Sequence, residues 1–149
     1  MSERFKLIPA VYLLLREDDN VLLLHRFNTG YQDGKYSLIA GHLDGDELAS
    51  KAMVREAKEE AGIVVDISDL KLVHTAHRLS RGDAGQERVD LFFETHKWTG
   101  KITNKEPNKC DDLSWFSINA IPTNVIPFVG SVLAAIQKGD PYSEYTTEP

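Results

Sequence analysis

The sequence has little of several features that mark particular classes of protein. It contains a single cysteine, Cys110, so it cannot form an internal disulfide, and this suits a reducing compartment. No apolar run approaches the length of a membrane-spanning helix, about 20 residues. The charged start, residues 1–6, lacks a secretory pattern. From these absences we expect a cytoplasmic protein with no membrane partner.

Positive charge is also scarce. The 149 residues include 17 Lys and Arg against 23 Asp and Glu, which gives a formal net charge of −6. No sequence-wide positive field is available to attract DNA or RNA, so we expect no nucleic-acid polymer as a partner. A small phosphate substrate is compatible with this charge, because bound divalent cations can supply the positive charge that the side chains lack.

Length and hydrophobicity set the size of the fold. A chain of 149 residues that is 42% hydrophobic can form one domain with a single core and is too short for two ordinary ones, so we expect one domain over residues 1–149. Strand-like runs occur before, between and after two helix-like runs, which predicts a mixed α+β class. The expected strands are residues 7–16, 21–26, 36–40, 63–65, 71–77, 88–98 and 113–116; the expected helices are 47–61 and 125–137; the tail, 139–149, is expected to fray.

The helix expected at residues 47–61 is the most distinctive segment. It contains good helix formers and no glycine or proline; Asp46 precedes it as a predicted N-cap, and Gly62 is placed to end it. On a helix that advances about 100° per residue, Glu56, Glu59 and Glu60 project within about 100° of one another. One face of the helix is therefore acidic.

Carboxylates held close together repel one another, and only solvent or a cation offsets that repulsion. Because oxygen ligands select hard ions, an ion held by Glu56, Glu59 and Glu60 is expected to be Mg²⁺ or Mn²⁺. Arg55 lies beside them in the sequence and can hydrogen-bond a carboxylate through two nitrogens, which fixes its orientation.

The alternative interpretation is that these glutamates are the solvated face of an amphipathic helix, which is the commoner situation for an acidic helix. A longer spacing argues against it: Gly41, five residues, Glu47, seven residues, then Arg55, Glu56, Ala57, Lys58, Glu59, Glu60, Ala61, Gly62 and Ile63. The fixed positions are each filled at about one in fifteen by chance, so an accidental match is on the order of one in 10⁸ per start point.

This spacing resembles the Nudix box at every fixed position, with Ala57 and Ile63 in its apolar slots. The resemblance is very specific over residues 41–63 and agrees in element order over most of the chain. It implies the Nudix fold, an α/β/α sandwich in which a mixed sheet lies between helices and the box forms a loop-helix-loop.

The resemblance also implies roles for the residues of the box. Glu56 and Glu60 match the family's metal ligands, and Glu59 matches a further ligand or the group that activates water. Glu47 completes the metal shell from the preceding loop, a backbone carbonyl near Ala40 contributes too, and Arg55 belongs to the catalytic group. The implied reaction is Mg²⁺-dependent hydrolysis of a diphosphate linkage in a nucleotide, in which water attacks phosphorus and a phosphate leaves.

Signatures of three Nudix subfamilies, those acting on NADH, dinucleoside polyphosphates and coenzyme A, are absent from the sequence. By elimination the chain is most similar to the small MutT-like nucleoside triphosphate pyrophosphohydrolases, which release a nucleoside monophosphate and pyrophosphate. An ADP-ribose or nucleotide-sugar pyrophosphatase, and a nucleotide-sensing module without turnover, are the alternatives. A monomer and a homodimer are both compatible with the sequence.

Residues outside the box provide candidate contacts with the substrate. Arg26 ends a strand before the loop 27–35, and it is either a phosphate ligand or an ordinary surface arginine. Glu106 and Lys109 lie in the late loop, where MutT-like enzymes place a further catalytic glutamate and where a lysine can contact phosphate. Asn124 matches a position that reads the base, or else caps a helix. Arg78 is a candidate for lining the cleft.

Overall fold

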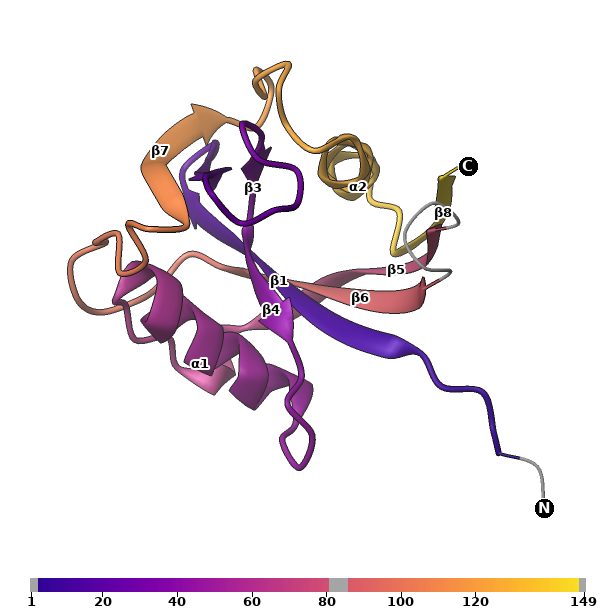
Figure 1. Cartoon of the computed structure of the whole chain (residues 1–149). Coiled ribbons are helices and arrows are strands. Elements are labelled where there is room, and N and C mark those ends of the chain that lie inside the picture. The colour runs from indigo at the N-terminus through magenta and orange to yellow at the C-terminus, as the bar shows by residue number, and fades with distance from the viewer. Residues whose placement is uncertain (1–2, 81–85, 148–149) are drawn as a thin grey trace.

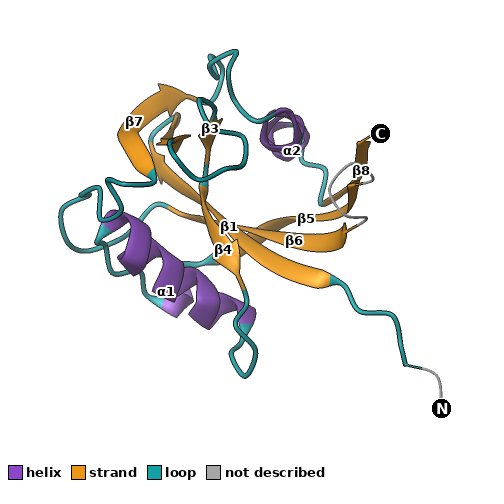
Figure 2. Ribbon diagram, in the orientation of Figure 1, coloured by secondary structure: helices purple, strands orange, loops and turns teal. Residues whose placement is uncertain are grey.

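The structure is a computed structural model that describes residues 3–80 and 86–147. Figure 1 traces the chain from its N-terminus to its C-terminus, and Figure 2 separates helices, strands and loops. In the described part, the strands are β1 (Ile8–Glu17), β2 (Asn20–Arg26), β3 (Tyr36–Ser37), β4 (Ile39–His42), β5 (Lys71–Ser80), β6 (Gln86–Thr95), β7 (Cys110–Ser117) and β8 (Tyr142–Thr147); the helices are α1 (Ala49–Ala61), the 3₁₀ turn η1 (Ile67–Asp69) and α2 (Pro127–Gln137).

The strands form a mixed sheet. Along its main path the order is β3-β2-β1-β6-β5-β8, while β4 pairs with β1 and β7 pairs with β2. The pairs β1·β6 and β5·β8 are parallel, and the other pairs between named strands are antiparallel. This agrees with the predicted mixed sheet and α+β class.

The two helices lie on opposite faces of the sheet, as Figure 1 shows. The central strand β1 is buried from Ala10 to Leu15, which explains its uninterrupted apolar sequence. Because side chains alternate along a strand, Val11 and Leu13 belong to the core on the α1 face, whereas Tyr12 and Leu14 belong to the core on the α2 face. The sequence prediction of a sheet between helices is confirmed.

The box helix is shorter at its start than predicted. It begins at Ala49; Leu48 occupies the N-cap position and makes no side-chain cap, so the predicted role of Asp46 is wrong. The reason is a turn in which Gly45 and Asp46 both have positive φ, 85° and 54°. At the other end, Gly62 adopts the left-handed conformation and closes the helix as predicted.

Two other predictions about secondary structure are corrected. The tail does not fray over residues 142–147, because β8 pairs in parallel with β5 from Thr75 to Ser80. The predicted strand at 63–65 is a single bridge, in which Val64 and Thr99 exchange backbone hydrogen bonds. The strands expected at 71–77 and 88–98 are β5 and β6, which reach Ser80 and begin at Gln86, so the polar loop expected between them is shorter; its residues 81–85 lie outside the described residues.

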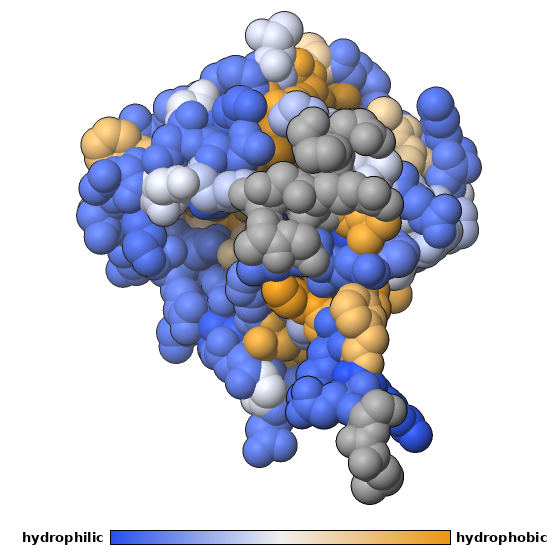
Figure 3. Space-filling model, turned by 45° about the vertical axis from the view of Figure 1, so that its right-hand side comes forward, coloured by the Kyte–Doolittle hydropathy of each residue, from blue (hydrophilic) through white to orange (hydrophobic). Residues whose placement is uncertain are grey.

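The surface in Figure 3 is polar over most of its area, with hydrophobic residues exposed in a band down the middle of the face. The N-terminal segment leads away from the sheet in Figure 1, and Phe5 and Leu7 on it are exposed. In the described part of the chain, neither α1 nor α2 is long and apolar enough to cross a membrane.

Candidate active site

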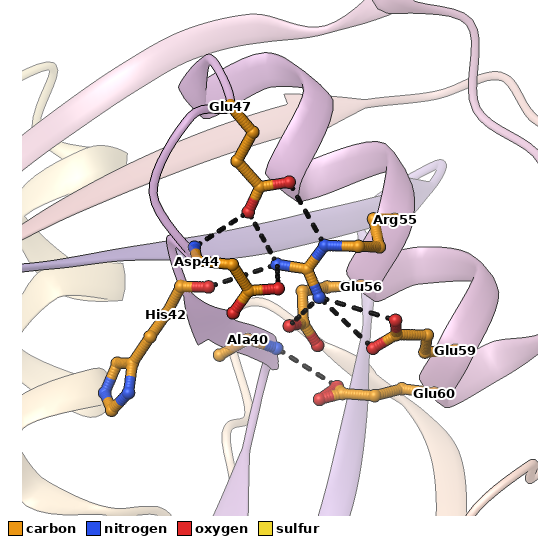
Figure 4. A network of polar contacts seen from close by, with 8 residues as sticks. All are labelled: Ala40, His42, Asp44, Glu47, Arg55, Glu56, Glu59 and Glu60. Atoms are coloured by element: carbon orange, nitrogen blue, oxygen red, sulfur yellow. Dashed lines mark hydrogen bonds and ion pairs between the residues drawn. The ribbon is translucent and has the colours of Figure 1, made fainter.

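Arg55, in the middle of the box helix, is the centre of a polar network (Figure 4). Its Nη2 and Nε donate to the two carboxylate oxygens of Glu47 at 2.8 and 3.2 Å, and its Nη1 donates to Glu56 Oε1 at 2.8 Å. Glu59 Oε2 lies 3.3 Å from Nη1, and Asp44 Oδ2 lies 3.3 Å from Nη2. One guanidinium therefore orients four carboxylates, and its pKa is raised further because Glu47 accepts its hydrogen bonds.

Position 41 is closely packed between β4 and the helix. A Cβ atom on Gly41 would overlap the carboxylate of Glu56, which leans over the backbone at this point. The loop and the helix of the box thus fit together through the first glycine and a glutamate fifteen residues later. Any side chain at position 41 would therefore require Glu56 to move.

Glu60 is the most enclosed carboxylate of the group. Its Oε2 accepts a hydrogen bond from the backbone N–H of Ala40 at 3.2 Å, on β4, the strand that precedes the loop of the box. Burial raises the pKa of Glu60 well above its ordinary value, and the neighbouring Glu56 raises it further. Burial also raises the pKa of Glu56, although Arg55 opposes the shift. An added cation would favour the charged form of both groups.

A cavity of about 510 Å³ opens beside the acidic face of α1. It gathers groups from four separate parts of the chain: the end of β2, the loop after it, the helix, and the loop before β7 together with the first residue of that strand. Its lining residues are Leu24, Arg26, Asn28, Thr29, Glu56, Glu59, Glu60, Glu106, Lys109 and Cys110. Carboxylates and cationic groups therefore share one pocket, which we call the carboxylate pocket.

The late loop reaches this pocket because it is fastened to the end of the helix. The backbone N–H of Lys105 donates to the carbonyl of Glu60 at 3.2 Å, and that of Thr103 donates to the carbonyl of Ala61 at 2.9 Å. On its other side, Lys109 accepts a backbone hydrogen bond from Phe27 at 2.9 Å. Glu106 and Lys109 are thereby placed at the pocket wall.

Arg26 is held at the pocket by the loop that follows it. Its Nε donates to the carbonyl of Tyr31 at 2.7 Å, and its Nη2 donates to the hydroxyl of Thr29 at 3.0 Å. The same loop is fixed by Asp33, which accepts hydrogen bonds from Thr29 and from the backbone of Gly30. The guanidinium is therefore oriented before any ligand arrives.

Two predicted substrate residues lie elsewhere. Arg78 is only 6% exposed and forms an ion pair with Asp90, with 3.2 Å between its Nε and Asp90 Oδ2, on the α2 face of the sheet. Asn124 donates through its side chain to the carbonyl of Gly34 at 3.2 Å. Neither residue lines the carboxylate pocket, and Asn124 does not cap α2, whose N-cap position is Ile126.

The donor set suits a hard divalent cation. The carboxylates of Glu47, Glu56, Glu59 and Glu60, with the backbone carbonyl of Ala40, can offer only oxygen ligands. Among the residues that the structure describes, no three His, Cys, Asp or Glu side chains already converge as a metal shell. In the network of Figure 4, Glu47, Glu56 and Glu59 are instead hydrogen-bonded to Arg55.

A larger hollow, about 920 Å³, lies elsewhere on the molecule, and its lining includes Val54 of α1, Val64 and Trp98. Its acidic residues are Asp66 and Asp69, and none of the box glutamates reaches it. This hollow is larger than the carboxylate pocket. The carboxylate pocket is nevertheless the better candidate for the active site, because its lining combines the box glutamates with cationic side chains.

The sequence interpretation missed several members of the site. Asp44 joins the Arg55 network from a position that the motif leaves free, and Asn28, Thr29 and Cys110 line the pocket. The polar composition of the loop 27–35 was the one available signal for Asn28 and Thr29. Nothing in the sequence marks Cys110 as a neighbour of the glutamates, because a different strand brings it there.

Comparison with solved structures supports the same fold. A MutT NUDIX hydrolase from Burkholderia pseudomallei matches with a TM-score of 0.78 and 22% identity, covering 87% of this chain and 98% of that one. The ORF135 protein of E. coli matches with a TM-score of 0.74 and 24% identity, covering 89% and 90% of the two chains. At these identities the likeness establishes the fold.

Curated relatives are longer proteins. The NAD-capped RNA hydrolase NudC of Pseudomonas aeruginosa is 28% identical over 117 residues, which is 78% of this chain and 38% of that protein. The protein of the same name from Vibrio atlanticus is 26% identical over 127 residues, which is 85% of this chain and 43% of that protein. The chain therefore spans about two fifths of the length of these relatives.

The model of the NUDIX domain family matches residues 6–136. That span contains β1 to β7, all of α1 and nearly all of α2, together with every residue of the carboxylate pocket. The chain belongs to the NUDIX domain family.

Proposed function

We propose that this chain is a divalent-cation-dependent pyrophosphohydrolase that cuts a diphosphate linkage in a small nucleotide. One observation carries the proposal: four carboxylates, those of Glu56, Glu59, Glu60 and Glu106, line one pocket together with Arg26 and Lys109. Membership of the NUDIX domain family supports the same reaction class. The surplus of negative charge suits a metal ion, and the cationic side chains suit phosphate oxygens.

Mg²⁺ is the proposed cofactor, with Mn²⁺ as a substitute. Glu56, Glu59 and Glu60 would hold it, with Glu47 and the carbonyl of Ala40 completing the shell. When bound, the ion neutralises phosphate charge and lowers the pKa of water. The burial of Glu60 fits this role, because a carboxylate that is costly to ionise alone is stabilised by an adjacent cation.

Residues of the chain bind the phosphate, orient the carboxylates and accept the proton. Arg26 and Lys109 hold the phosphate oxygens of the substrate, and Arg55 keeps Glu56 and Glu59 in orientation. Glu59 or Glu106 accepts a proton from water as the water oxygen bonds to phosphorus. The bond from phosphorus to the bridging oxygen breaks, and the leaving phosphate takes its electron pair.

A nucleoside triphosphate is the proposed substrate class, cleaved to a nucleoside monophosphate and pyrophosphate, by similarity to small MutT-like enzymes. A second candidate is cleavage of a diphosphate between two larger groups, as in ADP-ribose, a nucleotide sugar or NAD. The relatives named NAD-capped RNA hydrolase favour this second candidate. A nucleotide-sensing module is disfavoured because no glutamate of the box is missing.

A panel of substrates separates these functions. Nucleoside triphosphates, ADP-ribose, a nucleotide sugar and NAD would each be incubated with the protein and Mg²⁺, and phosphate and pyrophosphate would be measured separately. We expect pyrophosphate from the triphosphates. Turnover of NAD or ADP-ribose alone would select the second candidate, and binding of nucleotides without turnover would select the sensing module.

The position of cleavage is tested with water labelled by ¹⁸O. Attack at the α or β phosphorus puts the label in the monophosphate or in the pyrophosphate, which mass spectrometry distinguishes. Glu106→Gln is expected to lower kcat more than it raises KM, because the lost group acts on the reacting atoms. A nucleoside diphosphate with labelled orthophosphate would contradict the assigned class.

A further inference from the structure

The loop between Thr103 and Cys110 carries Glu106, and one side chain spans this loop. Asn104 Nδ2 donates to the backbone carbonyl of Cys110 at 2.5 Å, across the base of the loop. Asn104 Oδ1 accepts from the backbone N–H of Glu106 at 3.0 Å. The amide of Asn104 therefore joins the residue that begins β7 to the residue that carries the carboxylate.

Only a side chain with a donor and an acceptor on one short stem can make both bonds. A carboxylate has no donor for the carbonyl of Cys110, and an alanine has neither group. The orientation of the Asn104 amide follows from its partners, because a rotated amide would set oxygen against the carbonyl of Cys110 and NH₂ against the N–H of Glu106. The two contacts thus specify asparagine at this position.

The bonds of Asn104 complete a set that fixes the backbone at Glu106. The carbonyl of Glu106 accepts from the N–H groups of Lys109 and Cys110, each at 2.9 Å. One end of the loop is fastened to the helix, where Lys105 donates to the carbonyl of Glu60. With its N–H and its carbonyl both engaged, the backbone of Glu106 is held beside the carboxylate pocket, which the residue helps to line.

We propose that Asn104 is a positioning residue that holds Glu106 at the carboxylate pocket and so sets the rate of hydrolysis. This inference rests on the proposed function, in which Glu106 contributes to the chemical step. Asn104 itself is half-buried and does not line the pocket, so it acts through the loop. A displacement of about 1 Å in a catalytic group is enough to lower a rate by on the order of 10²-fold.

The test is a double-mutant cycle with Asn104→Ala, Glu106→Gln and the two combined, measured with the best substrate of the panel. We expect Asn104→Ala to lower kcat at least about tenfold and to change KM less than about twofold. In the Glu106→Gln background, Asn104→Ala should have no further effect on kcat, since the group that it positions has already been lost.

Controls separate positioning from folding. Asn108→Ala removes an exposed amide from the same loop and should leave kcat and KM as in the wild type. Asn104→Asp keeps the shape of the side chain and its acceptor but loses the donor, so it should also lower kcat. It serves as the test variant if Asn104→Ala does not fold, as judged by its melting temperature.

Three results would overturn the inference. The first is an equal loss of kcat when Asn104→Ala is introduced into the wild type and into Glu106→Gln. The others are a wild-type kcat in both Asn104 variants and a wild-type kcat in Glu106→Gln. If the wild-type protein hydrolyses nothing in the panel, the proposed function fails, and amide hydrogen exchange decides the positioning role. Faster exchange at the N–H of Glu106 in Asn104→Ala, with no change in Asn108→Ala, would support it. Unchanged exchange would overturn it.

Discussion

Two arginines, one on each face of the sheet, form carboxylate networks of opposite character. Arg55 is paired with four carboxylates at the edge of the carboxylate pocket, and 27% of its side chain is exposed. Arg78 is paired with Asp90, donates to the hydroxyl of Tyr12, and lies over the ring of Phe128 with its Cζ 4.2 Å from the ring centre. Only 7% of the Arg78 side chain and none of the Asp90 side chain is exposed.

The difference lies in the charge that each arginine leaves uncompensated. Around Arg55 the acids outnumber the base, and solvent can reach them, so the region can accept a cation and a charged substrate. Arg78 and Asp90 balance each other inside the protein, where any added charge would be costly to bury. The first network is therefore suited to function and the second to holding the α2 face together.

Removing the metal should have the largest effect. Exhaustive chelation is expected to abolish hydrolysis, because the carboxylate pocket then has a surplus of negative charge that repels the phosphate chain. Added Mg²⁺ or Mn²⁺ should restore the activity, measured as the release of pyrophosphate. Full turnover after chelation would show that the surplus of negative charge around Arg55 has no role in hydrolysis.

Substituting the glutamates on the α1 face should have the next largest effect. Glu59→Gln and Glu60→Gln keep the shape of the side chains but lose basicity and metal affinity, so each should lower kcat by at least about 10²-fold. Circular dichroism should show an intact fold. Glu17→Gln, an exposed glutamate at the end of β1, is the matched control and should retain activity. Wild-type activity in both pocket variants would refute the proposed site.

On the α2 face, breaking the ion pair should reduce stability. Asp90→Asn leaves the charge of Arg78 buried without a counterion, which should cost about 3 kcal/mol in the free energy of unfolding. Urea unfolding measures this loss. The combination of Asp90→Leu with Arg78→Met should recover most of it, because it leaves no buried charge.

The same experiment tests the predicted contact between Arg78 and the substrate. In the stable double variant, an unchanged KM would show that Arg78 has a structural role alone, and a raised KM would indicate that Arg78 contacts the substrate.

Arg55→Met, by contrast, should change the free energy of unfolding by about 1 kcal/mol or less, since the ion pairs of Arg55 are partly exposed. It should nevertheless lower kcat.

The smallest expected effect is a change in alkaline stability. Burial, together with the nearby charge of Asp90, raises the pKa of Tyr12 to about 12, so the folded protein favours the neutral phenol. The unfolded chain loses this proton near pH 10, so the stability that Tyr12 contributes is present below pH 10 and is lost as the pH rises toward 12. Tyr12→Phe should therefore lose less stability than the wild type across this interval, as measured by melting temperature. An equal loss in the two proteins would place the titrating group elsewhere.

The sequence by itself identified the family and the acidic face of the helix. Both are local properties: the spacing from Gly41 to Ile63 lies within one loop-helix-loop, and helical periodicity places Glu56, Glu59 and Glu60 on the same side. The end of the helix at Gly62 was predictable for the same reason. The start was not, because the turn at Gly45 and Asp46 lies in a loop whose Asp44 and Glu47 are paired with Arg55 on the helix.

Only the tertiary structure decided which distant residues join the glutamates. Arg26 and Glu106 meet the helix because β2 pairs with β7 and the late loop is fastened to Glu60 and Ala61. Arg78 lies away from the pocket, where it is paired with Asp90. The tail forms β8 because its backbone pairs with β5. These outcomes depend on contacts between residues far apart in the sequence, whose energies no local pattern of residues specifies.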